Sequence, residues 1–383
     1  MNHRTIENLL EMIDAMTSAD RARFGRVFEA RKIKGSCECP PSMVAWTQRH
    51  FGSIDKIESQ TVIRVHNSRT YEGALFNAVR ALRPTLQTTM DNILDQLSPK
   101  HDRRRECPFC KVRELTAVDS FTPQRIVGDR CVTASNAAKY DGRHGLIIFN
   151  NHDALAFSLD DLRDYIEVAN KWFRAATDIA QNFIYPFLIW NCGWRAGGSQ
   201  EHGHMQVTVA QGRPYPRIES LHRTAMDYQQ DFGESYFLDL FEIHNALGLG
   251  FQVLDTRVLV SLCPMRDKEI WLMSRALNTQ MATVLYAVLA TLRDQASVRS
   301  FNLGLLFPPA VPSLEWTDFP VIIRIIDRLS PAVLSSDISG MGLFAGADVI
   351  ASDPFTIASL LEKAFPRFID GAMHETAGPL LRK

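Results

Sequence analysis

Polar side chains alternate along one short apolar stretch of this chain, at His202, His204 and Gln206. The run Gly-His-Met-Gln-Val-Thr-Val-Ala, residues 203–210, predicts a strand, and side chains two residues apart in a strand point to the same face. Such a row needs partners, because each unpaired buried polar group costs about 1–3 kcal/mol. An exposed polar strand face is the alternative, but the neighbouring glycines and the flanking apolar strand favour a ligand site.

The segment ahead of this strand is rich in glycine. It begins at Asn191, continues through Gly193, and reaches Gly197, Gly198 and Ser199. A glycine backbone can approach a ligand closely, and the N–H groups of such a loop can bind phosphate. These residues therefore predict a phosphate-binding loop beside two histidines that share one strand face.

Short strands and single helices alternate along the rest of the chain. Ser158 is a favourable N-cap, and the aspartates that follow it begin an amphipathic helix. His144, after Asp-Gly-Arg, is expected in a turn. The order of elements favours an α+β fold with antiparallel sheets. Strands are predicted at 145–149, 187–191, 203–210, 257–262, 269–273 and 300–306, with a second helix at 282–293.

The first 95 residues or so predict a separate, mainly helical unit. Apolar residues recur at helical spacing around Leu9 and Phe24, and Lys32–Ser36 is expected to break the helix. The strongly polar run Asp102–Glu106 is a plausible domain boundary. Cys37 and Cys39 could bind a metal, but two ordinary thiols are the favoured interpretation.

The residues around the paired histidines resemble a known motif. They match the signature Asn-x-Gly-x-x-x-Gly-x-Ser-x-x-His-x-His-x-Gln at each fixed position, from Asn191 to Gln206. This is the active-site strand of the galactose-1-phosphate uridylyltransferase branch of the histidine-triad (HIT) superfamily. The resemblance covers most of the chain beyond the first sixty or so residues. It implies two HIT-like halves, at 96–215 and 216–383, with antiparallel sheets flanked by helices, and an N-terminal helical extension at 1–95.

The resemblance also implies a structural zinc site. Cys107 and Cys110 match the family's Cys-x-x-Cys, and His152 matches the segment that supplies a third ligand. With His202, the first histidine of the pair, they form a Cys₂His₂ set, which is typical of a closed tetrahedral zinc site. Taken alone, the Cys-x-x-Cys could also be a redox pair or a chance spacing.

Further site residues follow from the same comparison. Arg80 and Arg83 resemble an Arg-x-x-Arg-Pro segment near the phosphates of the nucleotide sugar, and Asn136 resembles an asparagine that contacts the nucleoside. Two positions depart from the pattern. Gly342 and Asp348 replace a Glu and a Gln of a strand that contacts hexose hydroxyls in the sugar-handling enzymes, so the hexose site is altered.

A mechanism follows from these assignments. An imidazole can attack the α-phosphorus of a nucleotide and hold the nucleotidyl group covalently, and His204 is the candidate nucleophile. A backbone carbonyl would hold its other ring nitrogen, while Gln206 and Ser199 would donate hydrogen bonds to phosphate oxygens. The related hydrolases usually carry His where Gln206 stands, so the resemblance favours group transfer.

The function expected is therefore nucleotidyl transfer between a nucleotide sugar and a sugar phosphate. Alternatives are a phosphorylase or hydrolase of nucleotide sugars or dinucleoside polyphosphates at the same site, and, less favoured, a non-catalytic nucleotide-binding scaffold. The family resemblance further implies a homodimer.

Composition excludes other classes of protein. The 42 Lys and Arg residues balance 43 Asp and Glu, which argues against a protein that coats nucleic acid or an anionic membrane. No apolar run approaches the roughly 20 residues needed to span a bilayer. Seven cysteines over 383 residues favour a reducing compartment, so a cytoplasmic location is expected.

Overall fold

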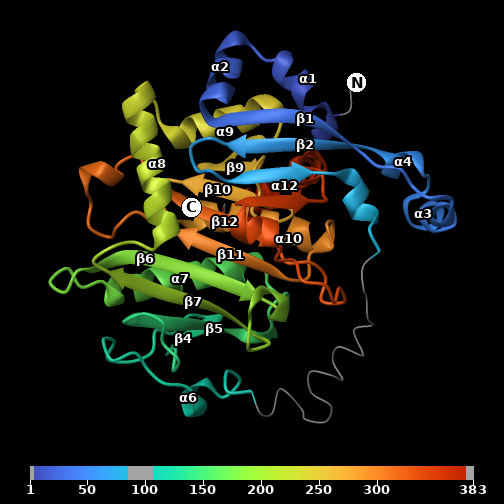
Figure 1. Cartoon of the computed structure of the whole chain (residues 1–383). Helices are drawn as coiled ribbons and strands as arrows, with labels where there is room; N and C mark the ends of the chain where they lie inside the picture. Colours follow the sequence, from blue (N-terminus) through green and yellow to red (C-terminus); the bar gives the residue numbers. More distant parts are fainter. Residues whose placement is uncertain (1–3, 85–106, 377–383) are drawn as a thin grey trace.

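A large antiparallel sheet forms the centre of the molecule (Figure 1). The structure is a computed structural model and describes residues 4–84 and 107–376. The nine strands of this sheet are, in spatial order, β4 (Cys131–Ser135), β5 (Arg143–Asp153), β7 (His202–Gln211), β6 (Phe183–Cys192), β11 (Phe301–Leu306), β12 (Val321–Asp327), β10 (Ile270–Ser274), β9 (Thr256–Val260) and β8 (Gly250–Val253).

A second, four-stranded sheet and a set of helices complete the fold. The second sheet has the order β1 (Phe28–Ser36), β2 (Ser59–Asn67), β3 (Gly73–Phe76) and β13 (Ala347–Ile350). The α-helices are α1 (Leu9–Asp14), α2 (Ser18–Val27), α3 (Val44–Phe51), α4 (Asp55–Glu58), α6 (Val112–Leu115), α7 (Leu159–Ala176), α8 (Pro216–Phe232), α9 (Tyr236–Leu247), α10 (Thr279–Asp294), α11 (Gly340–Phe344) and α12 (Pro354–Thr376). Short 3-10 helices lie at η1 (Ile6–Asn8), η2 (Pro41–Met43), η3 (Ala78–Leu82), η4 (Trp194–Ala196) and η5 (Leu314–Trp316).

The large sheet consists of two halves with the same arrangement. The first half has the spatial order β4-β5-β7-β6 and the second β9-β10-β12-β11, so each runs first, second, fourth, third along the chain. One long helix, α7 or α10, precedes the third strand of each half. The halves join where β6 pairs antiparallel with β11. This arrangement confirms the predicted α+β class and its antiparallel central sheet.

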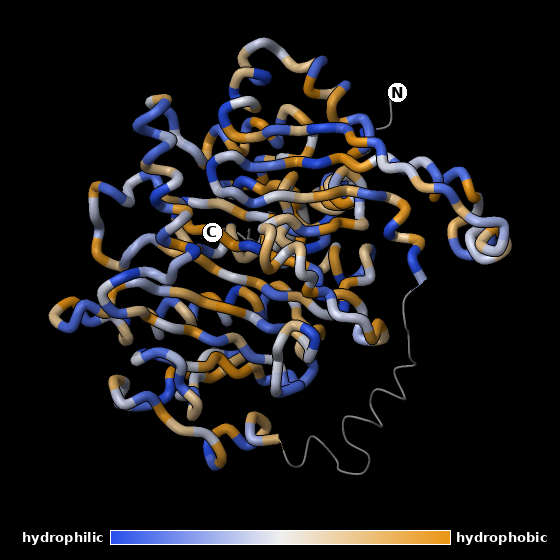
Figure 2. Tube along the Cα trace, viewed as in Figure 1, coloured by the Kyte–Doolittle hydropathy of each residue, from blue (hydrophilic) through white to orange (hydrophobic). Residues whose placement is uncertain are grey.

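The helices α7, α10 and α12 pack on one face of this sheet (Figure 1). Helix α7 begins with a capping box in which the side chains of Ser158 and Asp161 each accept a hydrogen bond from the other residue's backbone N–H. Its buried side includes Tyr165 and Trp172, which join the main core. Hydrophobic stretches, orange in Figure 2, recur along the strands of the large sheet. The opposite face of the first half is therefore the one available for a site.

The N-terminal region contains the expected helices but also strands that were not predicted. Lys32–Ser36, expected to break a helix, is the second half of β1, which pairs with β2 over nine residues. Most of β1 is exposed and lacks an apolar alternation, so its pairing partner, and not its local pattern, makes it a strand. The region is also not separate, because β13, from the C-terminal part of the chain, pairs in parallel with β3.

Two further points concern the predicted organisation. The boundary at 95/96 and the polar run Asp102–Glu106 lie outside the described residues, and the domain limits stay predictions. The stretch 340–348, which resembles a family strand, is divided here between the short helix α11 and the start of β13. Within the described part of the chain, no helix is both long enough and apolar enough to cross a membrane.

Candidate active site and metal centre

Strand β7 carries the paired histidines between β5 and β6, on the sheet face opposite the helices. The register pairs His204 with Ile148 and Gln206 with Leu146, so these four side chains share that face. Leu146 and Ile148 form a small apolar cluster with Ala134 on β4, and Phe109 and Val112 pack against it. The intervening residues, such as Met205, join the main core instead. This confirms the strand and the shared face predicted from the alternation.

The ring of His204 is neutral, and one of its two nitrogens, Nδ1, is already hydrogen-bonded to the backbone. Its Nδ1 lies 2.8 Å from the carbonyl oxygen of His202, an acceptor, so Nδ1 carries the proton and donates. Burial lowers the pKa of His204, and this hydrogen bond opposes the shift. The lone pair of Nε2 is then available as a nucleophile. Phe109 packs edge-on against the ring, with 5.0 Å between centroids.

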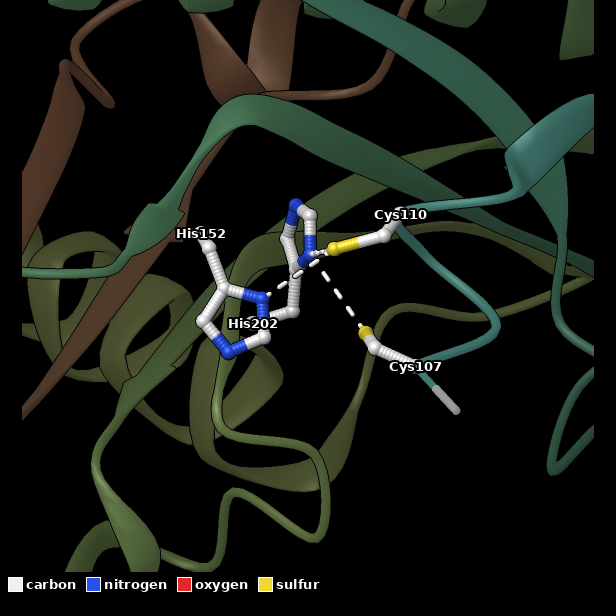
Figure 3. Close-up of side chains that lie close together, drawn as sticks. All are labelled: Cys107, Cys110, His152 and His202. Carbon is white, nitrogen blue, oxygen red and sulfur yellow. Dashed lines mark hydrogen bonds between the residues drawn. The ribbon is translucent and has the colours of Figure 1, made fainter. Parts of the chain in front are cut away.

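Two cysteines and two histidines converge beside His204 (Figure 3). Cys107 and Cys110 come from a tight turn, His152 from the end of β5 and His202 from the start of β7. Their ligand atoms all lie within 4.8 Å of one another. The Nδ1 of His202 is 3.5 Å from Sγ of Cys107 and 3.4 Å from Sγ of Cys110, and Nδ1 of His152 is 3.3 Å from the latter.

The donor set fits a tetrahedral zinc ion. Two thiolates and two imidazoles are the composition of a common structural zinc site. The other ring nitrogen of His202, Nε2, donates to the carbonyl oxygen of Phe149 at 2.7 Å, which leaves Nδ1 unprotonated and directed at the two sulfurs. Among the described residues, no other group of three or more such side chains could share an ion, and Cys37 and Cys39 are not part of this one.

Gly203, between the two histidines, has no room for a side chain. A Cβ atom there would lie 2.5 Å from the ring of Phe149 and 3.0 Å from the Cα atom of Ala154. The strand β5 has an irregular register between Ile148 and Asp153, which lets its end curve close to β7. Close approach of these two strands brings His152 to His202, so the metal cluster depends on the glycine.

Gln206 belongs to a polar network that the sequence did not reveal. Its Oε1 lies 3.0 Å from Nε2 of His144, 3.1 Å from the hydroxyl of Tyr140 and 3.5 Å from Nδ2 of Asn136. The predicted nucleoside contact Asn136 is thus brought to the site. His144 was expected in a turn, but it lies on β5 and is fully buried. Residues 144, 146 and 148 share one strand face, so His144 faces the same side as Gln206.

The hydrogen-bond donors of this network orient the Gln206 carboxamide. The backbone N–H of Tyr140 can only donate, and it contacts Nδ1 of His144 at 3.4 Å. Nε2 of the same ring lies 3.0 Å from Oε1 of Gln206 and also 3.0 Å from Nδ2 of Asn136. Burial lowers the pKa of His144, which favours the neutral form of the ring. The hydroxyl of Tyr140 and Nδ2 of Asn136 both donate to Oε1 of Gln206. The oxygen of Gln206 is occupied, and its NH₂ group is left for a ligand.

The glycine-rich loop connects β6 to β7. Gly193 and Gly197 have φ values of 85° and 87°, a region that side chains rarely adopt. A Cβ atom on Gly198 would lie 2.8 Å from the carbonyl oxygen of Asn191, so the loop folds tightly on itself. Ser199 is exposed near the end of the loop, three residues before β7 begins. Its hydroxyl is therefore open to a ligand, as the predicted role requires.

The remaining predicted residues lie apart from these contacts. Arg80 is in η3 and Arg83 directly follows it, and both are exposed. Neither is hydrogen-bonded to the site residues within the described structure. Gly342 and Asp348 line a cavity of about 500 Å³ between the second half and residues 70–73, and Asp348 forms an ion pair there with Arg266.

Two halves that share one antiparallel sheet, with a His-x-His strand on the open face of the first, define the structural class of this chain. No protein-family model and no curated protein matches it. Solved structures do match. One is an ADP-glucose phosphorylase from Arabidopsis thaliana with bound ADP-glucose, at 16% identity and a TM-score of 0.58, covering 77% of this chain and 96% of that one.

Two other similar structures have related names. A uridylyltransferase is 15% identical with a TM-score of 0.55, covering 80% of this chain and 99% of its own. A galT-like protein from Arabidopsis thaliana is 18% identical with a TM-score of 0.53, covering 68% and 92%. The chain therefore has the galT-like fold, which confirms the resemblance seen in the sequence at the level of the fold.

Proposed function

We propose that this protein is a nucleotidyl-transferring enzyme that works through a covalent nucleotidyl group on His204. The observation that carries the proposal is the hydrogen bond from Nδ1 of His204 to the carbonyl oxygen of His202. It leaves the lone pair of Nε2 as the nucleophile, on the same strand face as Gln206 and next to the glycine-rich loop. The galT-like fold supports the same chemistry.

The reaction has two displacements at one phosphorus. In the first, the Nε2 lone pair of His204 attacks the α-phosphorus of a nucleoside diphosphate compound, and the bond from phosphorus to the bridging oxygen breaks. The leaving phosphate group takes the electron pair of that bond. In the second, a phosphate oxygen of the acceptor attacks the same phosphorus, the P–N bond breaks, and His204 regains its lone pair. The NH₂ group of Gln206 and the hydroxyl of Ser199 donate to the phosphate oxygens in both steps.

A zinc ion fits the cluster beside this site. Cys107, Cys110, His152 and His202 would hold it, and it would supply structural cross-linking between the Cys-x-x-Cys turn and the two strands. His202 is two residues from His204 and provides the carbonyl that orients it. The cluster therefore fixes the start of β7 on which the nucleophile stands.

Inorganic phosphate is the second candidate acceptor, which would make the enzyme a phosphorylase. The altered hexose positions favour it: Gly342 has no side chain to contact a sugar, and Asp348 is paired with Arg266. Either acceptor leaves the first half-reaction unchanged. The proposal also includes a homodimer, which the family resemblance implies, and a cytoplasmic location, which the cysteine content favours.

Covalent labelling tests the first half-reaction. The protein is incubated with UDP-, GDP- and ADP-glucose and with Ap4A, each labelled with ³²P at the α-phosphate, and run on a denaturing gel. We expect label from at least one compound, stable in alkali and lost in acid, as a phosphoramidate behaves. The variant His204→Gly should take no label, and added imidazole should be nucleotidylated in its place. His50→Gln, on α3, is the matched control and should label normally.

Discharge of the label distinguishes the alternatives. Labelled protein is mixed with inorganic phosphate, glucose 1-phosphate or buffer alone. Release of a nucleoside diphosphate by phosphate indicates a phosphorylase, formation of a nucleotide sugar indicates a transferase, and release of a mononucleotide in buffer indicates a hydrolase. A wild-type protein that takes no label from any compound contradicts the covalent mechanism and favours a nucleotide-binding scaffold.

A further inference from the structure

The glycine-rich loop belongs to the first half of the chain, but the second half holds it. Asn302 on β11 lies opposite Asn191 on β6, at the junction of the two halves. Its Nδ2 donates to Oδ1 of Asn191 at 2.7 Å and to the carbonyl oxygen of Ala196, within the loop, at 2.8 Å. One side-chain amide therefore binds both the start of the loop and its middle.

The orientation of the Asn302 amide is determined by its neighbours. Its Oδ1 accepts a hydrogen bond from the guanidinium of Arg328, which has donors only. Arg328 is held in turn by the carboxylate of Asp337, through Nε and through Nη2 at 3.1 Å. The reversed amide would place its NH₂ group against Arg328 and its oxygen against two acceptors. This chain from Asp337 to Asn302 thus allows one orientation.

That orientation sets the carboxamide of Asn191. With Oδ1 of Asn191 occupied by Asn302, its Nδ2 hydrogens remain, and no acceptor among the described residues is hydrogen-bonded to them. Residue 189 pairs with Gln206, and residues 189 and 191 share a strand face, so Asn191 points to the same side as His204. Gln206 has the same property, because its oxygen is also occupied. Two NH₂ groups thus lie on the face that carries the nucleophile.

A second set of contacts attaches the loop to the same region. Arg195, in η4, donates hydrogen bonds to the carbonyl oxygens of Arg328, Val333 and Ser335. These acceptors belong to the segment that follows β12 and contains Asp337. The position of the loop relative to the sheet therefore depends on the second half, although the loop's own sequence comes from the first.

We propose that Asn302 is a positioning residue: it orients the Asn191 amide and anchors the glycine-rich loop so that both can donate hydrogen bonds to the nucleotide phosphates. This inference rests on the proposed nucleotidyl transfer. It assigns the second half a role in the reaction beyond packing. A displacement of about 1 Å at such a site can lower the rate about a hundredfold.

The test is a double-mutant cycle on covalent labelling. Asn302→Asp keeps the acceptor for Arg328 but replaces the NH₂ group with an oxygen, which repels Oδ1 of Asn191 and the Ala196 carbonyl. We expect it to lower the labelling rate at saturating nucleotide by about 10- to 100-fold. In the Asn191→Ala background the same change should cost clearly less, because only the contact with the Ala196 carbonyl is then left to disturb. The substrate is the α-labelled compound among UDP-, GDP- and ADP-glucose and Ap4A that labels wild type fastest.

Ser300→Ala is the matched control. Ser300 is fully buried, and its hydroxyl donates to the carbonyl oxygen of Cys192 at 2.9 Å across the same strand junction, without contacting Asn191 or Ala196. It should lower thermal stability while the labelling rate stays within about threefold of wild type and independent of Asn191. The melting temperature of Asn302→Asp, measured in parallel, separates a rate effect from unfolding. Asn302→Leu, which removes all three hydrogen bonds of the side chain without adding charge, should reproduce the loss of rate.

The outcomes separate the two proposals. No label on wild-type protein from any compound overturns the proposed function and this role together. Label on wild type with equal losses from Asn302→Asp in the presence and absence of Asn191 overturns the positioning role alone. The same holds if the labelling rates of both Asn302 variants stay within twofold of wild type. The positioning role is also overturned if the labelling rates of Asn302→Asp and Ser300→Ala fall together, in step with their melting temperatures.

Discussion

Acid should destabilise this protein through His244, a buried histidine on α9 that is 1% exposed. Its Nδ1 lies 2.7 Å from the carbonyl oxygen of Leu240, and its Nε2 lies 3.2 Å from the backbone nitrogen of Leu262. The Leu262 N–H can only donate, so Nε2 accepts, and the ring proton sits on Nδ1. A second proton, on Nε2, would point at the N–H of Leu262 and replace an attraction with a repulsion. Burial lowers the pKa of His244 from 6.5 to about 4, against the opposing effect of the Leu240 hydrogen bond.

The sign and size of the effect follow from these values. Between about pH 6.5 and pH 4, the unfolded chain binds a proton at this histidine and the folded chain does not. The free energy of unfolding therefore decreases as the pH falls through this range. One pKa unit corresponds to about 1.4 kcal/mol, so the change from about pH 7.5 to about pH 5 should remove about 2 kcal/mol through this residue.

Urea unfolding followed by tryptophan fluorescence measures this contribution. His244→Gln should be less stable than wild type near neutral pH by about 1–3 kcal/mol, since it cannot satisfy both backbone groups. Between the two pH values it should lose about 2 kcal/mol less than wild type does. Acid release of a metal would affect both proteins and cancels in this difference. His50→Gln, on α3, should keep the wild-type acid sensitivity. Equal losses in wild type and His244→Gln would refute the reasoning.

Four further results are expected. Elemental analysis should find about one zinc per chain in protein purified without chelators, and Cys107→Ser should lose both the metal and thermal stability; a wild-type protein without zinc contradicts the metal site. His144→Phe should slow covalent labelling at least tenfold, about 1.4 kcal/mol, with unchanged circular dichroism, and an unchanged rate would show that Gln206 does not need this partner. Gly203→Ala should lower the free energy of unfolding by about 1–3 kcal/mol, because its Cβ would overlap the ring of Phe149, and an unchanged melting curve would count against that contact. Light scattering should give the mass of two chains, and the mass of one chain at all concentrations contradicts the homodimer.

Much of the site could be predicted because its features are local in the sequence. The alternation of His202, His204 and Gln206 places them on one face of a strand, since the strand period is a property of the backbone. The start of α7 at Ser158 was likewise evident, because a capping box needs only four neighbouring residues. The four candidate metal ligands follow from the family resemblance, and the structure brings all four together.

Contacts between distant segments could not be read from the sequence. His144 meets Gln206 only through the register of β5 with β7, and Asn302 meets Asn191 only through the pairing of β6 with β11. Register depends on which faces are buried across the whole sheet, and a shift of one residue would turn each side chain to the other face. β1 became a strand for the same reason: its exposed, charged residues carry no strand pattern, and β2 supplies the hydrogen bonds. The sequence by itself determined which residues are candidates for the nucleophile and for the metal ligands, whereas the tertiary structure decided which residues contact and orient them, because long-range strand pairing sets those contacts.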